Sequence, residues 1–304
     1  MKPNLLVIGF TLSTAALQLA AQEPGPAATD SRRPFAHAPL PAPAAAESGG
    51  GGAAADSGAS QEALAKAAQN PVANLISIPF QNNFNFGIGP SEATQWVLNF
   101  QPVVPVTLSE NWNLITRWIT PVINQESPAP GMRSAFGLGD LNPSFFLSPA
   151  KSGKLIWGLG PTLTLPTATD PMLGFGEWMA GPAAVALTMQ GHWVIGALAN
   201  NQWSYAGWGE RQNRFLVQPF INYNLPDGWY LTTAPIMTAD WNANSDNRWT
   251  VPVGGGVGKI VKLGRLPLNL QLGAYYNVVT PDDFGADWQL RFQLQILLPK
   301  SIIH

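Results

Sequence analysis

The stretch Trp288-Gln-Leu-Arg-Phe-Gln-Leu-Gln-Ile-Leu-Leu298 alternates apolar and polar side chains along most of its length. Its even-numbered residues are Trp, Leu, Phe, Leu, Ile and Leu, whereas its odd-numbered residues from 289 to 295 are Gln, Arg, Gln and Gln. Successive side chains of a β-strand point to opposite faces. This segment therefore predicts a strand with one wholly apolar face and one mostly polar face.

The same alternation recurs throughout residues 71–304. It defines twelve candidate strands, near residues 73–87, 93–108, 112–124, 138–148, 154–167, 177–189, 192–206, 212–224, 229–241, 248–261, 266–279 and 287–298. The connections after even-numbered strands are tight turns, whereas those after odd-numbered strands are mostly longer, such as 125–136 and 167–176. Short turns on one side and long loops on the other are typical of outer-membrane barrels. The sequence therefore predicts an all-β fold: a transmembrane, antiparallel, up-and-down β-barrel of about twelve strands.

The composition excludes several other classes of protein. Only 11% of the 304 residues are charged, against about 25% in an ordinary soluble domain. A soluble β-sandwich, the main alternative, needs a charged outer face that this chain lacks. The net charge of −2 offers no basic face for nucleic acid. The absence of cysteine excludes disulfides and thiolate metal sites, and we expect no metal and no cofactor.

Most of the 12 tryptophans fall into two groups. Tryptophan is enriched at both membrane–water interfaces, so two groups at opposite strand ends predict two aromatic girdles. The group at the starts of odd-numbered strands comprises Trp112, Trp157, Trp193 and Trp229, and the opposite group comprises Trp96, Trp178, Trp203, Trp241, Trp249 and Trp288. Trp118 in mid-strand and Trp208 in a loop are the exceptions.

The N-terminal region has a different composition from the barrel. Residues 1–21 combine Lys2, an apolar run and terminal small residues, which predicts a secretory signal peptide. Residues 22–60 are rich in Ala, Pro and Gly and predict a disordered linker. Residues 61–70 favour a short helix that ends at Asn70-Pro71. An even strand count places both ends on the short-turn side, so we expect the linker and helix in the periplasm and the barrel at 71–304 in the bacterial outer membrane.

Polar residues at inward positions are the candidate functional residues, because they select solutes in a barrel. We expect the lumen to be lined by Arg117, Asp140, Glu177, Arg214, Asp240, Gln289, Arg291 and Gln293, together with Gln101, Gln218, Gln271 and Asn277. One interpretation is a narrow path that sorts small solutes. The other is that these ions pair with one another and stabilise a closed interior, because buried charges are usually paired.

Glycines and prolines interrupt the pattern. Eight prolines inside the strands should cause kinks or bulges, which leaves the strand count open by one pair; they are Pro102, Pro121, Pro143, Pro161, Pro182, Pro219, Pro235 and Pro252. The run from Gly254 to Lys259 resembles a phosphate loop, but that motif requires a following helix. Close packing or a kink explains these glycines better.

The sequence offers little for catalysis, and we expect no enzyme. His37 lies in the linker and His304 at the end, so His192 beside a turn is the remaining base for a membrane hydrolase. No Ser lies in a Gly-x-Ser-x-Gly motif. Asp282, Asp283 and Asp287 predict a solvated acidic loop rather than a cation site, because they lack ligand spacing.

Three blocks resemble a known family. They are Asn70-Pro-Val-Ala-Asn-Leu-Ile-Ser-Ile-Pro-Phe-Gln-Asn-Asn-Phe-Asn-Phe-Gly87, Gly137-Leu-Gly-Asp-Leu-Asn142 and Gln218-Pro-Phe-Ile-Asn-Tyr-Asn-Leu-Pro-Asp-Gly-Trp-Tyr230. They are similar to outer-membrane barrels labelled as members of a meta-pathway for phenol degradation. The resemblance covers residues 70–300 and implies uptake of small molecules, including aromatic or hydrophobic ones.

The sequence therefore predicts an outer-membrane channel or uptake port for small molecules, with membrane lipid and a small solute as its partners and a monomer as its default state. The alternative is a closed structural or surface-binding barrel without transport activity. Paired Arg and Asp residues across a lumen without a water-wide path would favour that alternative.

Overall fold

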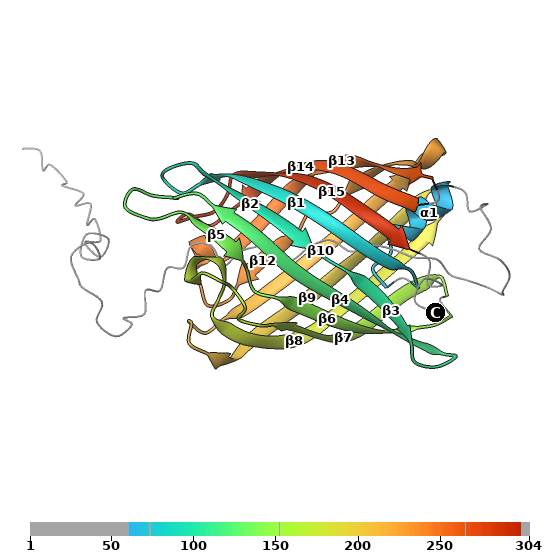
Figure 1. The fold of residues 1–304 in the computed structure, drawn as a ribbon, viewed down its shortest axis with the longest axis horizontal. Helices are drawn as coiled ribbons and strands as arrows, with labels where there is room; N and C mark the ends of the chain where they lie inside the picture. Colours follow the sequence, from blue (N-terminus) through green and yellow to red (C-terminus); the bar gives the residue numbers. More distant parts are fainter. Residues whose placement is uncertain (1–60, 73, 152, 265, 299–304) are drawn as a thin grey trace, which may run out of the picture. The chain divides into compact units, whose positions relative to one another are not determined.

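The computed structural model describes residues 61–298 apart from residues 73, 152 and 265. The expected signal peptide at 1–21 and the linker at 22–60 lie outside the described residues. The described part is an antiparallel β-barrel with one short helix at one end of its wall (Figure 1). This confirms the all-β, up-and-down fold expected from the alternation.

The barrel wall has twelve strand positions around the ring, here called staves, and each of three staves is made of two shorter strands. The uninterrupted strands are β1 (Ile76–Ile88), β4 (Trp112–Gln125), β7 (Leu155–Thr164), β8 (Glu177–Gln190), β9 (Trp193–Gly207), β10 (Asn213–Asn224), β13 (Trp249–Leu263), β14 (Leu266–Val279) and β15 (Trp288–Leu298). The interrupted staves are β2 (Ala93–Phe100) with β3 (Val103–Thr107), β5 (Ala135–Leu138) with β6 (Asn142–Pro149), and β11 (Trp229–Thr233) with β12 (Met237–Asp240). The remaining elements are α1 (Gln61–Ala67) and the 3₁₀ turns η2 (Pro171–Leu173), η3 (Pro226–Gly228) and η4 (Ser245–Asn247). Each stave pairs with its neighbours in the chain, and β1 pairs with β15 to close the ring.

The prolines disturb the wall less than the sequence suggested. Pro102 and Pro235 lie in the gaps between β2 and β3 and between β11 and β12, and a register shift accompanies Pro252. Beside Pro121 the register of β4 changes by one residue between its pairing with β6 and its pairing with β5. The pairing continues in register past Pro143, Pro161, Pro182 and Pro219, so a bulge does not occur at every proline. A proline removes one donor but keeps its carbonyl, and Gly139 N donates to the Pro121 carbonyl at 2.9 Å.

The glycines of β13 allow close packing, as expected. A side chain at Gly258 would overlap the ring of Tyr230, which lies opposite it on β11. The Tyr230 hydroxyl donates to Asn269 Oδ1 at 2.7 Å. The aromatic ring therefore lies against bare backbone and reaches a partner on the next stave, which joins β11, β13 and β14.

The outer face of the barrel is apolar. In the middle of three neighbouring strands, Val257, Leu272 and Phe292 are paired side by side and are 43%, 49% and 41% exposed. Water does not solvate such a face well, whereas lipid does. The outward alternation of the strands thus places their apolar side chains where a membrane would contact them.

Several tryptophans lie at strand ends on this outer face. Trp112, Trp193 and Trp229 are the first residues of their strands, and Trp249 and Trp288 begin strands at the opposite end. Trp112 and Trp157 contact each other with ring centroids 6.1 Å apart, and Trp241 and Trp249 do so at 5.5 Å. The assignment of these groups to membrane interfaces stays a prediction.

The interior is amphipathic. Amide-rich strands form one wall, with Gln289, Gln293 and Gln295 on β15, Gln81, Asn83 and Asn85 on β1, and Gln95 and Asn99 on β2 all buried. Strands β8 to β10 lie half-way round the ring from this wall. Their buried side chains include polar ones such as Asn200, Gln202 and Gln218. They also include an apolar group that belongs to one cluster: Ala183, Val185, Leu187, Val194, Leu198, Leu216 and Phe220. The amide wall therefore faces a mixed wall that contains an apolar cluster.

The helix α1 lies at the short-turn end of the barrel. It contacts η3, one of the short turns, and Gln69 after it exchanges amide hydrogen bonds with Asn224 at 2.9 and 3.2 Å. Ala65 and Ala68 pack with Tyr230 in a small apolar cluster. No helix in the described part of the chain is long and apolar enough to cross a membrane.

Candidate functional site: a cavity in the long-loop half of the lumen

A cavity of about 160 Å³ lies inside the barrel, in the half nearest the long loops. Its wall comes from the loop-side ends of the strands, for example Thr164 at the end of β7 and Met179 near the start of β8. Loop residues Phe175 and Phe284 also line it. The lining thus mixes polar and apolar groups from strands far apart in the sequence.

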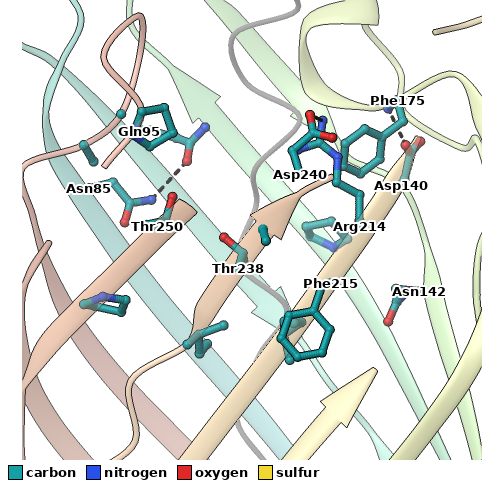
Figure 2. A pocket seen from close by; sticks show the side chains of 18 of the residues that line it. Asn85, Gln95, Asp140, Asn142, Phe175, Arg214, Phe215, Thr238, Asp240 and Thr250 are labelled. Atoms are coloured by element: carbon teal, nitrogen blue, oxygen red, sulfur yellow. Dashed lines mark hydrogen bonds and ion pairs between the residues drawn. The ribbon is translucent and has the colours of Figure 1, made fainter. Parts of the chain in front are cut away.

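Five of the eight residues expected to line the lumen lie around this cavity: Asp140, Arg214, Asp240, Gln289 and Arg291. Figure 2 shows Asp140, Phe175, Arg214 and Asp240 gathered on one side of the cavity. On that side Arg214 forms an ion pair with Asp240, with 3.0 Å between nitrogen and oxygen. The Arg214 guanidinium also lies 5.1 Å from the centre of the Phe175 ring. Positive charge, negative charge and an aromatic face are therefore combined at one place.

Asp140 positions a loop. Its carboxylate accepts hydrogen bonds from the backbone N–H of Ala168 at 3.1 Å and of Phe175 at 2.6 Å. Both donors belong to the long loop between β7 and β8. Gly174 has no room for a side chain there, because a Cβ would approach the Asp140 carboxylate closely. Asp140 therefore holds the backbone of this loop at the lumen, which positions the Phe175 ring in the cavity wall.

A directed chain of hydrogen bonds runs along the amide wall. Arg291 Nη2 donates to Gln289 at 2.8 Å, and Gln289 Nε2 donates to Asn85 at 2.8 Å. Asn85 Nδ2 donates to Gln95 at 3.0 Å, and Gln95 Nε2 donates to Gln125 at 2.9 Å. Figure 2 shows Asn85 and Gln95 joined in this way. The chain crosses four neighbouring staves, and such networks hold their side chains in defined positions.

The segment 234–236 between β11 and β12 folds inward and forms part of the cavity floor. Ala234, Pro235 and Ile236 are all buried, whereas a strand would bury alternate residues. The Ala234 carbonyl accepts from Arg291 Nη1 at 3.0 Å, and the Ala234 N–H donates to the Tyr275 hydroxyl at 3.3 Å. Bonds from β14 and β15 therefore hold this segment across the interior.

Below this floor, apolar side chains fill the short-turn half of the lumen. Ile115, Phe146, Leu187 and Val194 are between 0% and 2% exposed and belong to one cluster. The same cluster includes Val72, from the segment between α1 and β1. We take this cluster as the floor of the cavity on the short-turn side.

Asn277 also lines the cavity, whereas the other expected lumen residues do not. Arg117 and Gln293 are buried in the middle of β4 and β15. Glu177 is buried at the start of β8, with its carboxylate 3.8 Å from the guanidinium of Arg211. In the middle of the barrel the amide oxygens of Gln101, Gln218 and Gln293 are buried without a protein donor. Buried acceptors of this kind normally bind water or a ligand, which indicates a polar, wettable zone beside the apolar floor.

Sequence reasoning missed three parts of the site: Phe175, the inward segment 234–236 and the pairing of Asn85 with Gln95. The asparagine and glutamine could have been found, because both occupy inward positions of alternating strands. Phe175 gave no such signal, because a loop has no period. Pro235 predicted an interruption of the strand, but it did not predict that the interrupted segment turns into the lumen.

The hydrolase alternative depends on His192. Its Nδ1 lies 3.1 Å from Glu62 Oε1 on α1, and its side chain is 55% exposed. Within the described residues, no serine hydroxyl forms a hydrogen bond with it. A Ser–His pair is therefore absent at this position in the described part of the chain. No group of three or more His, Cys, Asp or Glu residues among those described is arranged to hold a metal ion.

Comparison with known proteins supports the fold. The sequence matches no family model and no curated protein. An outer-membrane channel from Pseudomonas putida F1 is similar in structure, with a TM-score of 0.58 and 16% identity over 74% of this chain and 94% of that chain. The NanC porin has a TM-score of 0.46 with 9% identity over 72% and 98% of the two chains. Outer membrane phospholipase A from Escherichia coli has a TM-score of 0.40 with 13% identity over 73% and 89%. At such identities the likeness to the channel establishes a shared barrel fold.

Proposed function

We propose that the protein is an outer-membrane channel or uptake port for small amphipathic molecules. The observation that carries the proposal is the amphipathic lumen, in which the amide wall on β15, β1 and β2 faces the apolar cluster within the mixed wall on β8 to β10. A solute with one polar group and one apolar group finds a partner for each on opposite sides of the path. The likeness to an outer-membrane channel supports the same function.

The resemblance to the phenol-degradation barrels gives this proposal a solute class: small aromatic or hydrophobic compounds. The apolar outer face and the paired tryptophans support a position in the bacterial outer membrane. In that orientation α1 and the short turns lie on the periplasmic side and the cavity opens towards the long loops. The monomer is the assembly that we propose.

The packed floor favours a second candidate, a closed barrel that binds solutes without passing them. Transport requires the floor to move, because apolar side chains fill the short-turn half of the lumen. The inward segment 234–236 is the part of the floor that lacks strand pairing. We therefore place the movement there.

A swelling assay separates the two candidates. Purified, folded protein is reconstituted into liposomes, and the uptake of small uncharged and aromatic solutes is followed by light scattering. We expect slow uptake by the native protein and severalfold faster uptake by Ile236→Ala, which thins the floor. Ile195→Ala is the matched control, because Ile195 faces outward and is 43% exposed. No uptake by either the native protein or Ile236→Ala would exclude the channel and leave the closed barrel.

A further inference from the structure

The most unusual charge in the cavity belongs to Arg291. Its side chain is 2% exposed, yet the residue lines the cavity near the floor. A buried charge is normally paired with an opposite charge. Among the described residues Arg291 forms no ion pair with a carboxylate, and its hydrogen-bond acceptors are neutral.

The guanidinium is nevertheless held rigidly. It donates to Asn83 Oδ1 at 3.2 Å, to the Ala234 carbonyl at 3.0 Å and to Gln289 Oε1 at 2.8 Å. The ring of Tyr275 lies under it, with 4.6 Å between the guanidinium carbon and the ring centre. A guanidinium has five N–H donors, so these three bonds leave two donors for another acceptor. The cation is thus positioned for a ligand but not neutralised.

The rest of the cavity does not supply the missing negative charge. Three arginines and two aspartates line it, which leaves one net positive charge. Asp240 is paired with Arg214, and Asp140 accepts two backbone N–H groups. Arg248 donates to the Ala243 carbonyl, a neutral acceptor. Both carboxylates are therefore already engaged, and the field at Arg291 favours an incoming anion.

The size and lining of the cavity limit the rest of the ligand. Its volume is about 160 Å³, and an apolar cavity of about 150 Å³ holds one benzene ring. Ile119, Leu216 and Ile236 supply apolar surface in the same lining as Arg291. A planar anion with two oxygens matches the guanidinium fork better than a spherical one.

We infer that the cavity binds a small organic carboxylate with a single ring-sized apolar group, and that Arg291 is the residue that recognises the carboxylate. The inference rests on the proposed function to the extent that it names the class of solute taken into the channel. The two remaining N–H donors of Arg291 bind the carboxylate oxygens, and the ring occupies the space above the packed floor. Arg291 thus determines specificity, whereas Arg214 and Asp240 neutralise each other.

Calorimetric titration of the full-length, detergent-solubilised protein with benzoate and with benzyl alcohol tests this inference. The two probes share a ring, but only benzoate carries a carboxylate. We expect benzoate to bind at least tenfold more tightly than benzyl alcohol. Arg291→Gln should abolish this preference, and acidification below the pKa of free benzoic acid should abolish it in the native protein. Equal affinities in the native protein, or an unchanged preference in Arg291→Gln, would overturn the inference.

Two further variants keep the test decisive. The double variant Arg133→Gln/Asp170→Asn removes one positive and one negative charge from an ion pair that does not line the cavity, so it should keep the preference for benzoate. Should Arg291→Gln fail to fold, Arg291→Lys replaces it, since lysine keeps the charge but loses the fork. We expect Arg291→Lys to weaken benzoate binding severalfold and to leave benzyl alcohol unchanged. Unchanged benzoate binding in Arg291→Lys would contradict recognition by the fork.

The proposed channel function and the proposed ligand class are tested by different assays. Solute uptake in liposomes without a preference for benzoate would overturn the ligand class and leave the channel intact. Benzoate binding without uptake by the native protein or Ile236→Ala would overturn the channel and leave a binding barrel. The two measurements use separate preparations, so each result is read independently.

Discussion

Leu272→Arg is the sharpest test of which face of the barrel contacts lipid. Leu272 is the seventh residue of β14, near its middle, and is 49% exposed. Val257 and Phe292 flank it on the neighbouring strands and are also exposed and apolar. If this row faces the bilayer core, an arginine there is surrounded by hydrocarbon on its open side.

The expected loss of stability follows from this geometry. An arginine on the lipid face costs about 2–4 kcal/mol at the bilayer midplane and about 0–1 kcal/mol near the interfaces. Because Leu272 lies at mid-strand, we expect about 2–4 kcal/mol, a roughly 30- to 700-fold change in the folding equilibrium constant. The side chain is about half covered by its neighbours and an arginine can reach towards the interface, so the lower part of this range is expected.

Gln271→Arg is the matched control, because Gln271 is the preceding residue and faces inward, opposite Gln293. An arginine there can donate to the unpartnered amide oxygen of Gln293. The measurement is equilibrium urea unfolding in phosphocholine vesicles, followed by tryptophan fluorescence. A loss below about 1 kcal/mol for Leu272→Arg would refute the assignment of this face to lipid. An equal loss for Gln271→Arg would refute it as well.

Three further perturbations test the packing and the loops. Gly258→Val should displace the Tyr230 ring and lower the unfolding free energy by about 1–3 kcal/mol, measured by urea unfolding. The hydrogen bond from Arg133 lowers the pKa of Asp170. The stability that this ion pair contributes is therefore fully present above the usual Asp pKa of about 3.9 and is lost as the pH falls below it. An NMR titration that showed an ordinary pKa for Asp170 would contradict this. Asp140→Asn removes one charge-assisted bond to the loop at 167–176, so deuterium uptake there should accelerate roughly tenfold or more, and unchanged uptake would exclude the anchoring role.

The local alternation of apolar and polar residues was enough to predict most of the fold. A side chain's face depends only on its position in a strand, so the segment 288–298 alone indicates which residues face outward and which face inward. The strand count and the alternation of short and long connections follow from the same pattern with turn residues. Even the prolines left the count unchanged, because each removes a single donor from a ladder held by its neighbours.

Only the closed barrel decides which inward residues meet. Arg291 reaches the Ala234 carbonyl because β15 and the interrupted stave curve around the same lumen, although the two residues are 57 positions apart in the chain. Asp140 holds Phe175 for the same reason, across a loop that has no period of its own. The sequence by itself determines the two faces of each strand, since that property is local. The cavity, its floor and its unpaired arginine depend on contacts across the interior, and those contacts exist only once the ring has closed.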